Sequence, residues 1–318
     1  MDGKATMANA TPDLRVRLAG LELKNPVTVA SGTFGYGQEY SHYFDIARLG
    51  AVTTKSISLL PRAGNRPPRI IETPAGMLNA IGLQNVGVEA YLREKAPFLR
   101  EKGATIIANI VGNSAEEYAE LAARIEREEG ADAIEANLSC PNVHDAKRGG
   151  GAALVSQSPE AVAAYTRSIR AATNLPLFVK LSPNVMDIRE PALAAQEAGA
   201  DGVSLINTLM GMVIDPETRR PALANMVGGL SGPAIRPVAV KMVWDAARAV
   251  HIPVIGMGGV CTARDAVEFI LAGASCVAVG SVTFRQPDAA IRIIEGIADY
   301  MRRHHAATMR ELVGAMAE

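Results

Sequence analysis

Residues Ala133 to Cys140, AIEANLSC, form a short and mostly apolar run that stops at the pair Pro141–Asn142. An apolar run that does not alternate with polar residues is typical of a strand buried on both faces, as in a parallel sheet. The end of this run carries a thiol, flanked by two carboxamides and a hydroxyl, where a core would favour Val or Ile. The segment therefore predicts both a parallel sheet and an unusual strand end.

Further runs of the same kind recur along the chain, bounded by Gly, Pro or Asn and separated by helical patterns. The eight runs are residues 26–32, 51–58, 105–112, 133–140, 177–183, 202–208, 253–260 and 276–281. Between two of them, the helical segment 114–130 has Ser114 and Glu117 as a capping box and Gly130 as a stop signal. Eight β–α units in series predict an α/β protein with a (β/α)8 TIM barrel fold.

We expect residues 1–318 to form this one barrel as a single domain. Residues 14–26 predict an additional N-terminal hairpin that closes the bottom of the barrel. Residues 1–12 are expected to be a frayed, disordered leader, because they lack a hydrophobic signal core.

The composition excludes several classes of protein. Nearly half of the residues are apolar, and 32 basic residues are balanced by 33 acidic ones, which argues against nucleic acid or an anionic membrane as the main partner. No segment approaches the roughly 18–20 apolar residues of a membrane-spanning helix. The three cysteines are too few and too scattered for disulfides, a metal site or an iron–sulfur cluster. We therefore expect a cytoplasmic protein with reduced thiols and no bound metal.

The spacing of the eight runs shows where the chain departs from a minimal barrel. Three intervals are much longer than the rest, through additional residues at 59–86, 141–157 and 209–232. All three follow the carboxyl ends of strands, the face on which barrel enzymes carry their active sites. Long loops at this face are usually functional. The segment 141–151, with three consecutive glycines, is the best candidate for a mobile lid.

Polar residues gather at the ends of the predicted strands. A strand-end Asn or Ser also commonly caps the next helix, so each one alone is ambiguous. A lysine within an apolar strand is more informative, because burying an unpaired ammonium is costly. No carboxylate lies on the predicted strands of Lys55 and Lys180, which favours anionic ligands as their partners. The strand-end residues are Ser31, Lys55, Ser56, Asn109, Asn137, Cys140, Lys180, Asn207, Thr208, Gly258, Gly259, Gly280 and Ser281.

Glycines end the last two strands, in GMGGV (256–260) and AVGS (278–281). They let backbone N–H groups approach a phosphate at the usual phosphate site of a barrel, although simple tight turns would use the same residues. The chain has no GxxxxGK[ST] motif, and GTFGYG (32–37) has the wrong spacing for a dinucleotide site. Together with two lysines and an amide-rich rim, the glycines favour flavin mononucleotide (FMN).

Three carboxamides, Asn79, Asn137 and Asn207, come from different loops on the same face. Because a carboxamide both donates and accepts, the set suits the alternating N–H and C=O groups of a pyrimidine edge. A lysine beside them could bind a carboxylate on that ring.

At these positions the sequence closely resembles the class 1 dihydroorotate dehydrogenases. The resemblance spans almost the whole chain in the expected order, and it is greatest to the class 1B, NAD-linked catalytic subunits. One departure is Val86, where proline is expected, and it concerns loop stiffness. The matching motifs are TTKSIS (53–58), NAIGLQN (79–85), NLSCPN (137–142), FVKLSP (178–183), INT (206–208), GGLSGPAI (228–235), GMGGV and AVGS.

The resemblance implies a role for each matching residue. The residues implied to bind FMN are Ser31, Lys55, Ser56, Asn109, Asn137, Lys180, Ile206, Gly232, Gly258, Gly259, Gly280 and Ser281. Those implied to bind dihydroorotate or orotate are Lys55, Asn79, Ala80, Ile81, Gly82, Leu83, Asn137, Asn207 and Thr208.

The implied reaction is the oxidation of (S)-dihydroorotate to orotate in pyrimidine biosynthesis. Cys140 would be the catalytic base that takes the C5 proton, while a hydride leaves C6 for the flavin, and Lys180 would stabilise the reduced flavin. His144 is a rival base, although a solvated loop histidine is the simpler interpretation, and Cys261 and Cys276 are expected to be ordinary cysteines.

The resemblance also implies partners. A class 1B chain pairs as a homodimer with two further subunits, each with FAD and a [2Fe–2S] cluster, which pass electrons to NAD⁺. Three alternatives remain at this point: a class 1A enzyme that reduces fumarate, a dihydropyrimidine dehydrogenase subunit, and a non-redox lyase with a phosphate-binding barrel.

Overall fold

A computed structural model describes residues 11–139 and 155–317, and its centre is a sheet of eight parallel strands. The order of strands is β3-β16-β15-β10-β9-β8-β7-β4, and a parallel bridge between Thr28 and Ala51 joins the two edge strands into a barrel. Each predicted run contains one strand, so the TIM barrel prediction is confirmed. The strands are β3 (Val27–Val29), β4 (Val52–Thr53), β7 (Ile106–Ile110), β8 (Ala133–Asn137), β9 (Leu177–Lys180), β10 (Gly202–Leu205), β15 (Val254–Met257) and β16 (Cys276–Val279).

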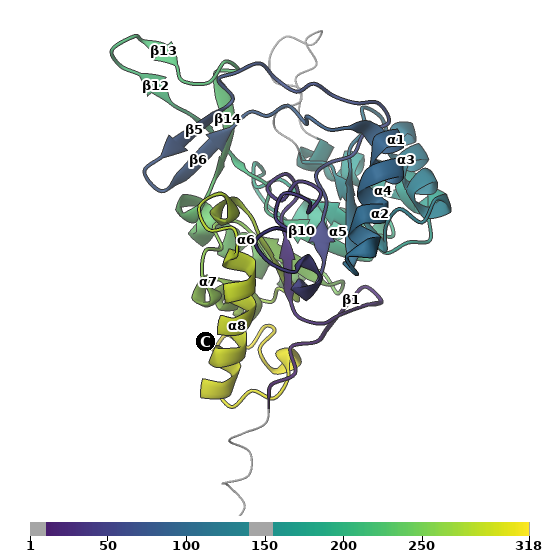
Figure 1. Cartoon of the computed structure of the whole chain (residues 1–318), viewed down its shortest axis with the longest axis vertical. Helices are drawn as coiled ribbons and strands as arrows, with labels where there is room; N and C mark the ends of the chain where they lie inside the picture. The colour runs from purple at the N-terminus through teal and green to yellow at the C-terminus, as the bar shows by residue number, and fades with distance from the viewer. Residues whose placement is uncertain (1–10, 140–154, 318) are drawn as a thin grey trace, which may run out of the picture.

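Helices surround the strands (Figure 1). The connection after β3 holds only a short 3-10 helix, η1 (Ile46–Arg48), so the first of the eight predicted β–α units lacks its α-helix. The remaining helices are α1 (Gly87–Ala90), the π-helical η2 (Tyr91–Lys95), α2 (Ala96–Glu101), α3 (Ala115–Arg127), α4 (Pro159–Ala172), α5 (Arg189–Glu197), α6 (Arg236–Ala249), α7 (Ala263–Leu271) and α8 (Ala289–Arg303), with short turns η3 (Val155–Gln157), η4 (Pro233–Ile235), η5 (Ser281–Phe284) and η6 (Met309–Glu311).

The ends of α3 follow the sequence signals only in part. Ser114 is the N-cap, and its hydroxyl accepts a hydrogen bond from the N–H of Glu117. The carboxylate of Glu117 accepts from the N–H of Asn113 rather than completing the predicted capping box. The helix ends before Gly130, and Glu129 takes the left-handed conformation, with φ of 53°. A neighbouring residue therefore replaces the predicted glycine stop.

An N-terminal hairpin closes the bottom of the barrel, as predicted. Its strands β1 (Val16–Leu18) and β2 (Leu21–Leu23) are antiparallel. Leu18 and Leu23 are buried in one cluster with Phe178 and other residues inside the barrel. Burial of these side chains stabilises the closed end by the hydrophobic effect.

Two of the three insertions join to form a second sheet, which the sequence did not reveal. The strands β5 (Ile70–Thr73) and β6 (Gly76–Asn79) pair with β14 (Val227–Ser231) and β11 (Leu209–Met212) in the antiparallel order β11-β14-β6-β5. A two-stranded hairpin, β12 (Ile214–Asp215) and β13 (Arg220–Pro221), extends from it, and the whole sheet projects to one side of the barrel (Figure 1).

The remaining insertion, 141–157, lies outside the described residues up to residue 154, so the predicted lid is not placed. The predicted leader also lies outside them, except for Thr11 and Pro12, and Pro12 is buried. No helix in the described part of the chain is long and apolar enough to cross a membrane.

Candidate active site

A cavity of about 340 Å³ lies at the carboxyl ends of the barrel strands. Its lower wall consists of strand-end residues such as Ser31 and Gly280, and its upper wall includes Met77, Asn79 and Ser231 from the second sheet. A cavity of this size, lined by apolar side chains and a few polar groups, suits a small ligand or cofactor.

Most of the predicted site residues line this cavity. From the FMN set, these are Ser31, Lys55, Ser56, Asn137, Lys180, Ile206, Gly232, Gly258, Gly259, Gly280 and Ser281. From the substrate set, they are Lys55, Asn79, Ile81, Gly82, Leu83, Asn137, Asn207 and Thr208. Cys140, the predicted base, and His144, its rival, lie outside the described residues.

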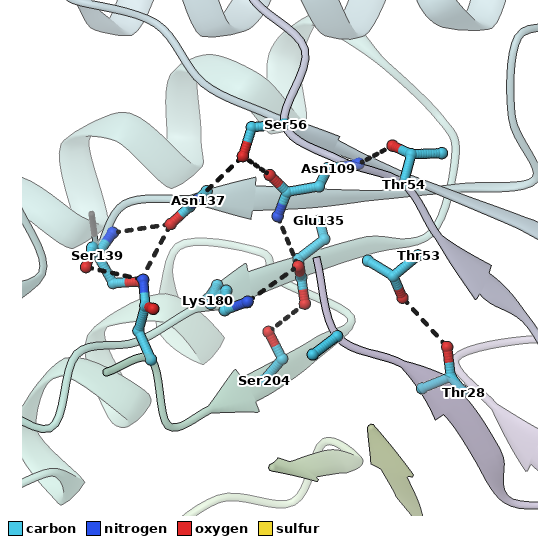
Figure 2. A network of polar contacts seen from close by, with 12 residues as sticks. Thr28, Thr53, Thr54, Ser56, Asn109, Glu135, Asn137, Ser139, Lys180 and Ser204 are labelled. Carbon is cyan, nitrogen blue, oxygen red and sulfur yellow. Dashed lines mark hydrogen bonds and ion pairs between the residues drawn. The ribbon is translucent and has the colours of Figure 1, made fainter. Parts of the chain in front are cut away.

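Asn109 is the exception in the FMN set, because it is fully buried and does not line the cavity. Its carboxamide accepts a hydrogen bond of 2.5 Å from the hydroxyl of Ser56 and donates one of 2.6 Å to Glu135 (Figure 2). Asn109 therefore supports a cavity residue from behind. A position in a predicted strand could not show that Ser56 lines the cavity while Asn109 lies behind it.

Ala80 is the exception in the substrate set. Its N–H donates to the carbonyl of Arg69, and its carbonyl accepts from Asn65. The N–H of Asn65 also donates to the carbonyl of Ile81. The loop 62–69 thus holds the loop 79–85 in place, and Ala80 forms part of that attachment rather than of the cavity wall.

Two cations lie at one end of the cavity, Lys55 and Arg69. Burial lowers the pKa of Lys55, the charge of Arg69 lowers this pKa further, and Glu39 opposes the shift. The guanidinium of Arg69 is held by the side chain of Gln84 at 2.6 Å and the carbonyl of Asn65 at 3.1 Å. The sequence analysis did not select Arg69. The feature that could have indicated it was the presence of an arginine in the insertion 59–86, on the face that carries the cavity. This end of the cavity suits a carboxylate.

A network of amides and hydroxyls forms another part of the wall. The hydroxyl of Ser139 donates to Asn137 at 3.1 Å, and Asn207 donates to both the carbonyl and the hydroxyl of Ser139 at 2.9 Å. Asn184 donates to the carbonyl of Thr208 at 3.1 Å. The carboxamides of Asn137, Asn184 and Asn207 thereby fix the backbone at Ser139, directly before Cys140, and at Thr208.

Glycines shape the opposite end. Gly232, Gly258 and Gly259 have φ values of 101°, 127° and 77°, in the left-handed region that side chains disfavour. A Cβ on Gly259 would lie 2.6 Å from the carbonyl oxygen of Gly232. Only glycine therefore allows this close backbone approach, and the resulting concave surface of backbone and the hydroxyl of Ser281 fits a phosphate group.

Lys180 has a partner that sequence reasoning missed. Its ammonium lies 3.7 Å from a carboxylate oxygen of Glu135 on the neighbouring strand, and both side chains are almost fully buried (Figure 2). The protein therefore supplies a counter-ion for Lys180, although this side chain also lines the cavity. The available signal was an acid inside the run AIEANLSC, next to a strand with a buried lysine.

The two described cysteines are poor candidates for a base. Cys276 is fully buried in β16, and burial raises its pKa. Burial and the nearby carboxylate of Asp265 also raise the pKa of Cys261. Neither thiol therefore ionises readily. Among the described residues, no group of three or more His, Cys, Asp or Glu is placed to hold a metal ion.

Comparison with known proteins assigns the chain to a family. The family model described as dihydroorotate dehydrogenase matches residues 13–301. The chain belongs to the dihydroorotate dehydrogenase family. It is thus an oxidoreductase of a flavin-dependent family. It is 53% identical over 305 residues to the "Dihydroorotate dehydrogenase B (NAD(+)), catalytic subunit" of Geotalea uraniireducens, with 96% of this chain and 98% of that protein covered.

Other members of the dihydroorotate dehydrogenase family agree with this assignment. The protein of the same description from Geobacter sulfurreducens is 52% identical over 305 residues, with 96% of this chain and 98% of that protein covered. A crystal structure of the Eimeria tenella enzyme in complex with ferulenol superposes with a TM-score of 0.76 at 23% identity, covering 95% of this chain and 88% of that one. This second likeness supports the barrel fold alone.

Proposed function

We propose that this chain is the catalytic subunit of an NAD-linked dihydroorotate dehydrogenase, which oxidises (S)-dihydroorotate to orotate in pyrimidine biosynthesis. The observation that carries the proposal is the 53% identity, over nearly the whole chain, to proteins described as that subunit. The overall reaction is dihydroorotate plus NAD⁺ giving orotate, NADH and a proton.

The cationic end of the cavity binds the substrate carboxylate in this proposal. Lys55 supplies a point charge and Arg69 a second positive charge beside it. The carboxamides of Asn79, Asn137 and Asn207 pair with the N–H and C=O groups of the ring. In a site that excludes much of the solvent, these contacts bind the substrate and fix its orientation.

The base must face C5 of the bound ring. Cys140 is proposed for this role from the family resemblance, and Ser139, the residue before it, is anchored to Asn137 and Asn207. The thiolate would take the C5 proton while the two electrons leave C6 as a hydride. A positioned base of this kind accelerates a reaction by roughly 10²–10⁴-fold.

The cavity also fits FMN. The left-handed glycines Gly232, Gly258 and Gly259 accommodate its phosphate, and Lys180 offers an ammonium to the flavin ring. FMN, when bound, supplies a hydride acceptor. The protein residues position the substrate and the cofactor against each other and exclude water.

Electrons leave through a second protein in this proposal. The full-length relatives are described as catalytic subunits, a description that implies at least one other subunit. We propose that this partner carries FAD and a [2Fe–2S] cluster, and that two catalytic chains and two partner chains form a heterotetramer.

The proposal is tested by purifying the chain, adding FMN and removing oxygen. We expect a flavin absorbance spectrum that is bleached by dihydroorotate, with orotate as the product and as a competitive ligand. Dihydrouracil is the control substrate and should bleach it far more slowly, because it lacks the carboxylate. A chain that takes up no FMN, or bleaches equally with dihydrouracil, would contradict the proposed function.

A further inference from the structure

Glu135 is a buried carboxylate directly behind the cavity. It is 2% exposed and lies on β8, where it is surrounded by polar groups from three other strands or their ends. The carboxamide of Asn109 and the hydroxyl of Ser204 each donate a hydrogen bond of 2.6 Å to it, one to each oxygen (Figure 2). These two donors satisfy both carboxylate oxygens and fix the orientation of the side chain.

Lys180 lies between this carboxylate and the cavity. Its ammonium is 3.7 Å from Glu135, which exceeds hydrogen-bond distance, and its side chain lines the cavity while Glu135 does not. Among the described residues, Lys180 has this one ion-pair partner and no hydrogen-bond partner. The donors of the ammonium therefore remain available to a ligand, while the carboxylate keeps the charge of the pair balanced.

We propose that Glu135 is a positioning residue that holds Lys180 toward the cofactor and lowers the reduction potential of the bound flavin. The proposal rests on the FMN site proposed above. Reduction adds negative charge to the flavin next to Lys180. With Glu135 ionised, two negative charges then share one buried ammonium. Without that carboxylate, the ammonium and the reduced ring would balance each other, and reduction would be more favourable.

This arrangement has a use in a chain that must pass its electrons on. Lys180 alone would stabilise the reduced flavin strongly and slow its reoxidation. Glu135 offsets part of that effect, so the flavin can still be reduced by substrate and reoxidised by an acceptor. Because both charged groups are buried, salt should screen their interaction little.

The experiment compares flavin-loaded wild type with Glu135→Gln, which keeps the size but removes the charge. The amide oxygen of the glutamine can still accept from Asn109, while its NH2 group donates to the hydroxyl of Ser204, which accepts instead of donating. The reduction potential is measured by equilibration with a redox dye. We expect at least a tenfold higher ratio of reduced to oxidised flavin in Glu135→Gln at the same dye potential, about 30 mV for a two-electron couple. The shift should persist in 0.5 M salt, roughly a fivefold excess over 0.1 M conditions.

Two further variants serve as controls. Glu135→Asp keeps the charge but moves it away from Lys180, so its potential should lie between those of wild type and Glu135→Gln. Glu295→Gln removes a carboxylate that is 60% exposed on α8 and pairs with Arg48, and it should leave the potential unchanged. If Glu135→Gln does not fold, the test is made with Glu135→Asp, whose flavin reduction potential should be higher than that of wild type.

The outcomes separate this inference from the proposed function. Wild-type protein that neither binds FMN nor is reduced by dihydroorotate would contradict the proposed function itself. If wild type behaves as proposed but Glu135→Gln or a folded Glu135→Asp has the wild-type potential, Glu135 has only a structural role and this inference is wrong.

Discussion

Lys55 and Lys180 both interrupt apolar strands, yet the fold gives them different surroundings. Lys180 has the carboxylate of Glu135 at 3.7 Å. Lys55 lies beside the positive charge of Arg69, and burial and that charge both lower its pKa. The ammonium of Lys55 therefore gains more from an anionic ligand than that of Lys180, because the protein itself balances less of its charge. Lys55 is therefore the residue whose titration should be visible in ligand binding.

The binding of orotate should weaken as pH rises. Only protonated Lys55 attracts the carboxylate. Because its pKa is lowered, the ammonium loses its proton at a lower pH than an ordinary lysine, whose pKa is about 10.4. We expect the dissociation constant of orotate, measured by flavin absorbance between pH 7 and 10, to increase through this range. Lys55→Gln corrects for ionisation of the ligand and of other groups. It should bind weakly throughout, and a pH dependence parallel to wild type would rule out Lys55 as the cause.

Cys140→Ser should slow reduction of the flavin by dihydroorotate by at least about 10²-fold, because a serine hydroxyl is a much weaker acid than a thiol and supplies less base. Binding of orotate should change little. Single-turnover absorbance measurements test the rate, and Cys261→Ser is the matched control. Equal rates in Cys140→Ser and wild type would exclude the proposed base.

At the scale of elements, the second sheet determines where the substrate residues lie. Asn79 ends β6 and pairs with Gly229 on β14, which in turn packs on Thr208 after β10. A Cβ on Gly229 would lie 1.9 Å from the hydroxyl of Thr208. Gly229 therefore holds Asn79 and Thr208 close to each other.

Gly229→Ala should consequently displace Thr208 or β14. We expect the KM for dihydroorotate to increase by about ten- to a hundredfold, as misplaced binding groups commonly cause. The FMN content should stay at the wild-type level. Gly211→Ala is the control on the adjacent strand β11, where a Cβ would lie 3.0 Å from the end of the Leu78 side chain and 3.7 Å, an ordinary contact distance, from the Cβ of Leu230. Similar KM values for both variants would contradict this packing argument.

The sequence revealed the barrel elements much better than the second sheet. Continuous apolar runs identify buried parallel strands locally, so each of the eight strands was predicted. The strands β6 and β14 belong to distant insertions, and the burial of their residues is only partial. Their pairing depends on contacts between loops, for which hydrophobic periodicity gives no signal. For the same reason, the support that Asn109 and Glu135 give to cavity residues became visible only in the structure.

At the scale of the molecule, this chain should not transfer electrons to NAD⁺ by itself. Purified, FMN-loaded protein should oxidise dihydroorotate with an artificial acceptor, and its NAD⁺ reduction should be near zero until the partner subunit is added. Steady-state absorbance at the NADH band tests this. Efficient NAD⁺ reduction by the chain alone would contradict the proposed assembly, and efficient fumarate reduction would indicate class 1A chemistry.

The barrel closes between its first and last strands. The N–H of Ala30 donates to the carbonyl of Val279, next to Ser31 and Gly280 in the cavity wall. The ribosome synthesises the side with Ser31 early and the side with Gly280 late. The nascent chain therefore exposes unpaired strand edges until β16 emerges, and it has no complete place for a flavin before then. The cofactor should consequently bind after synthesis is complete, and scarcity of flavin should leave a folded apoprotein with a closed barrel rather than partly folded chains.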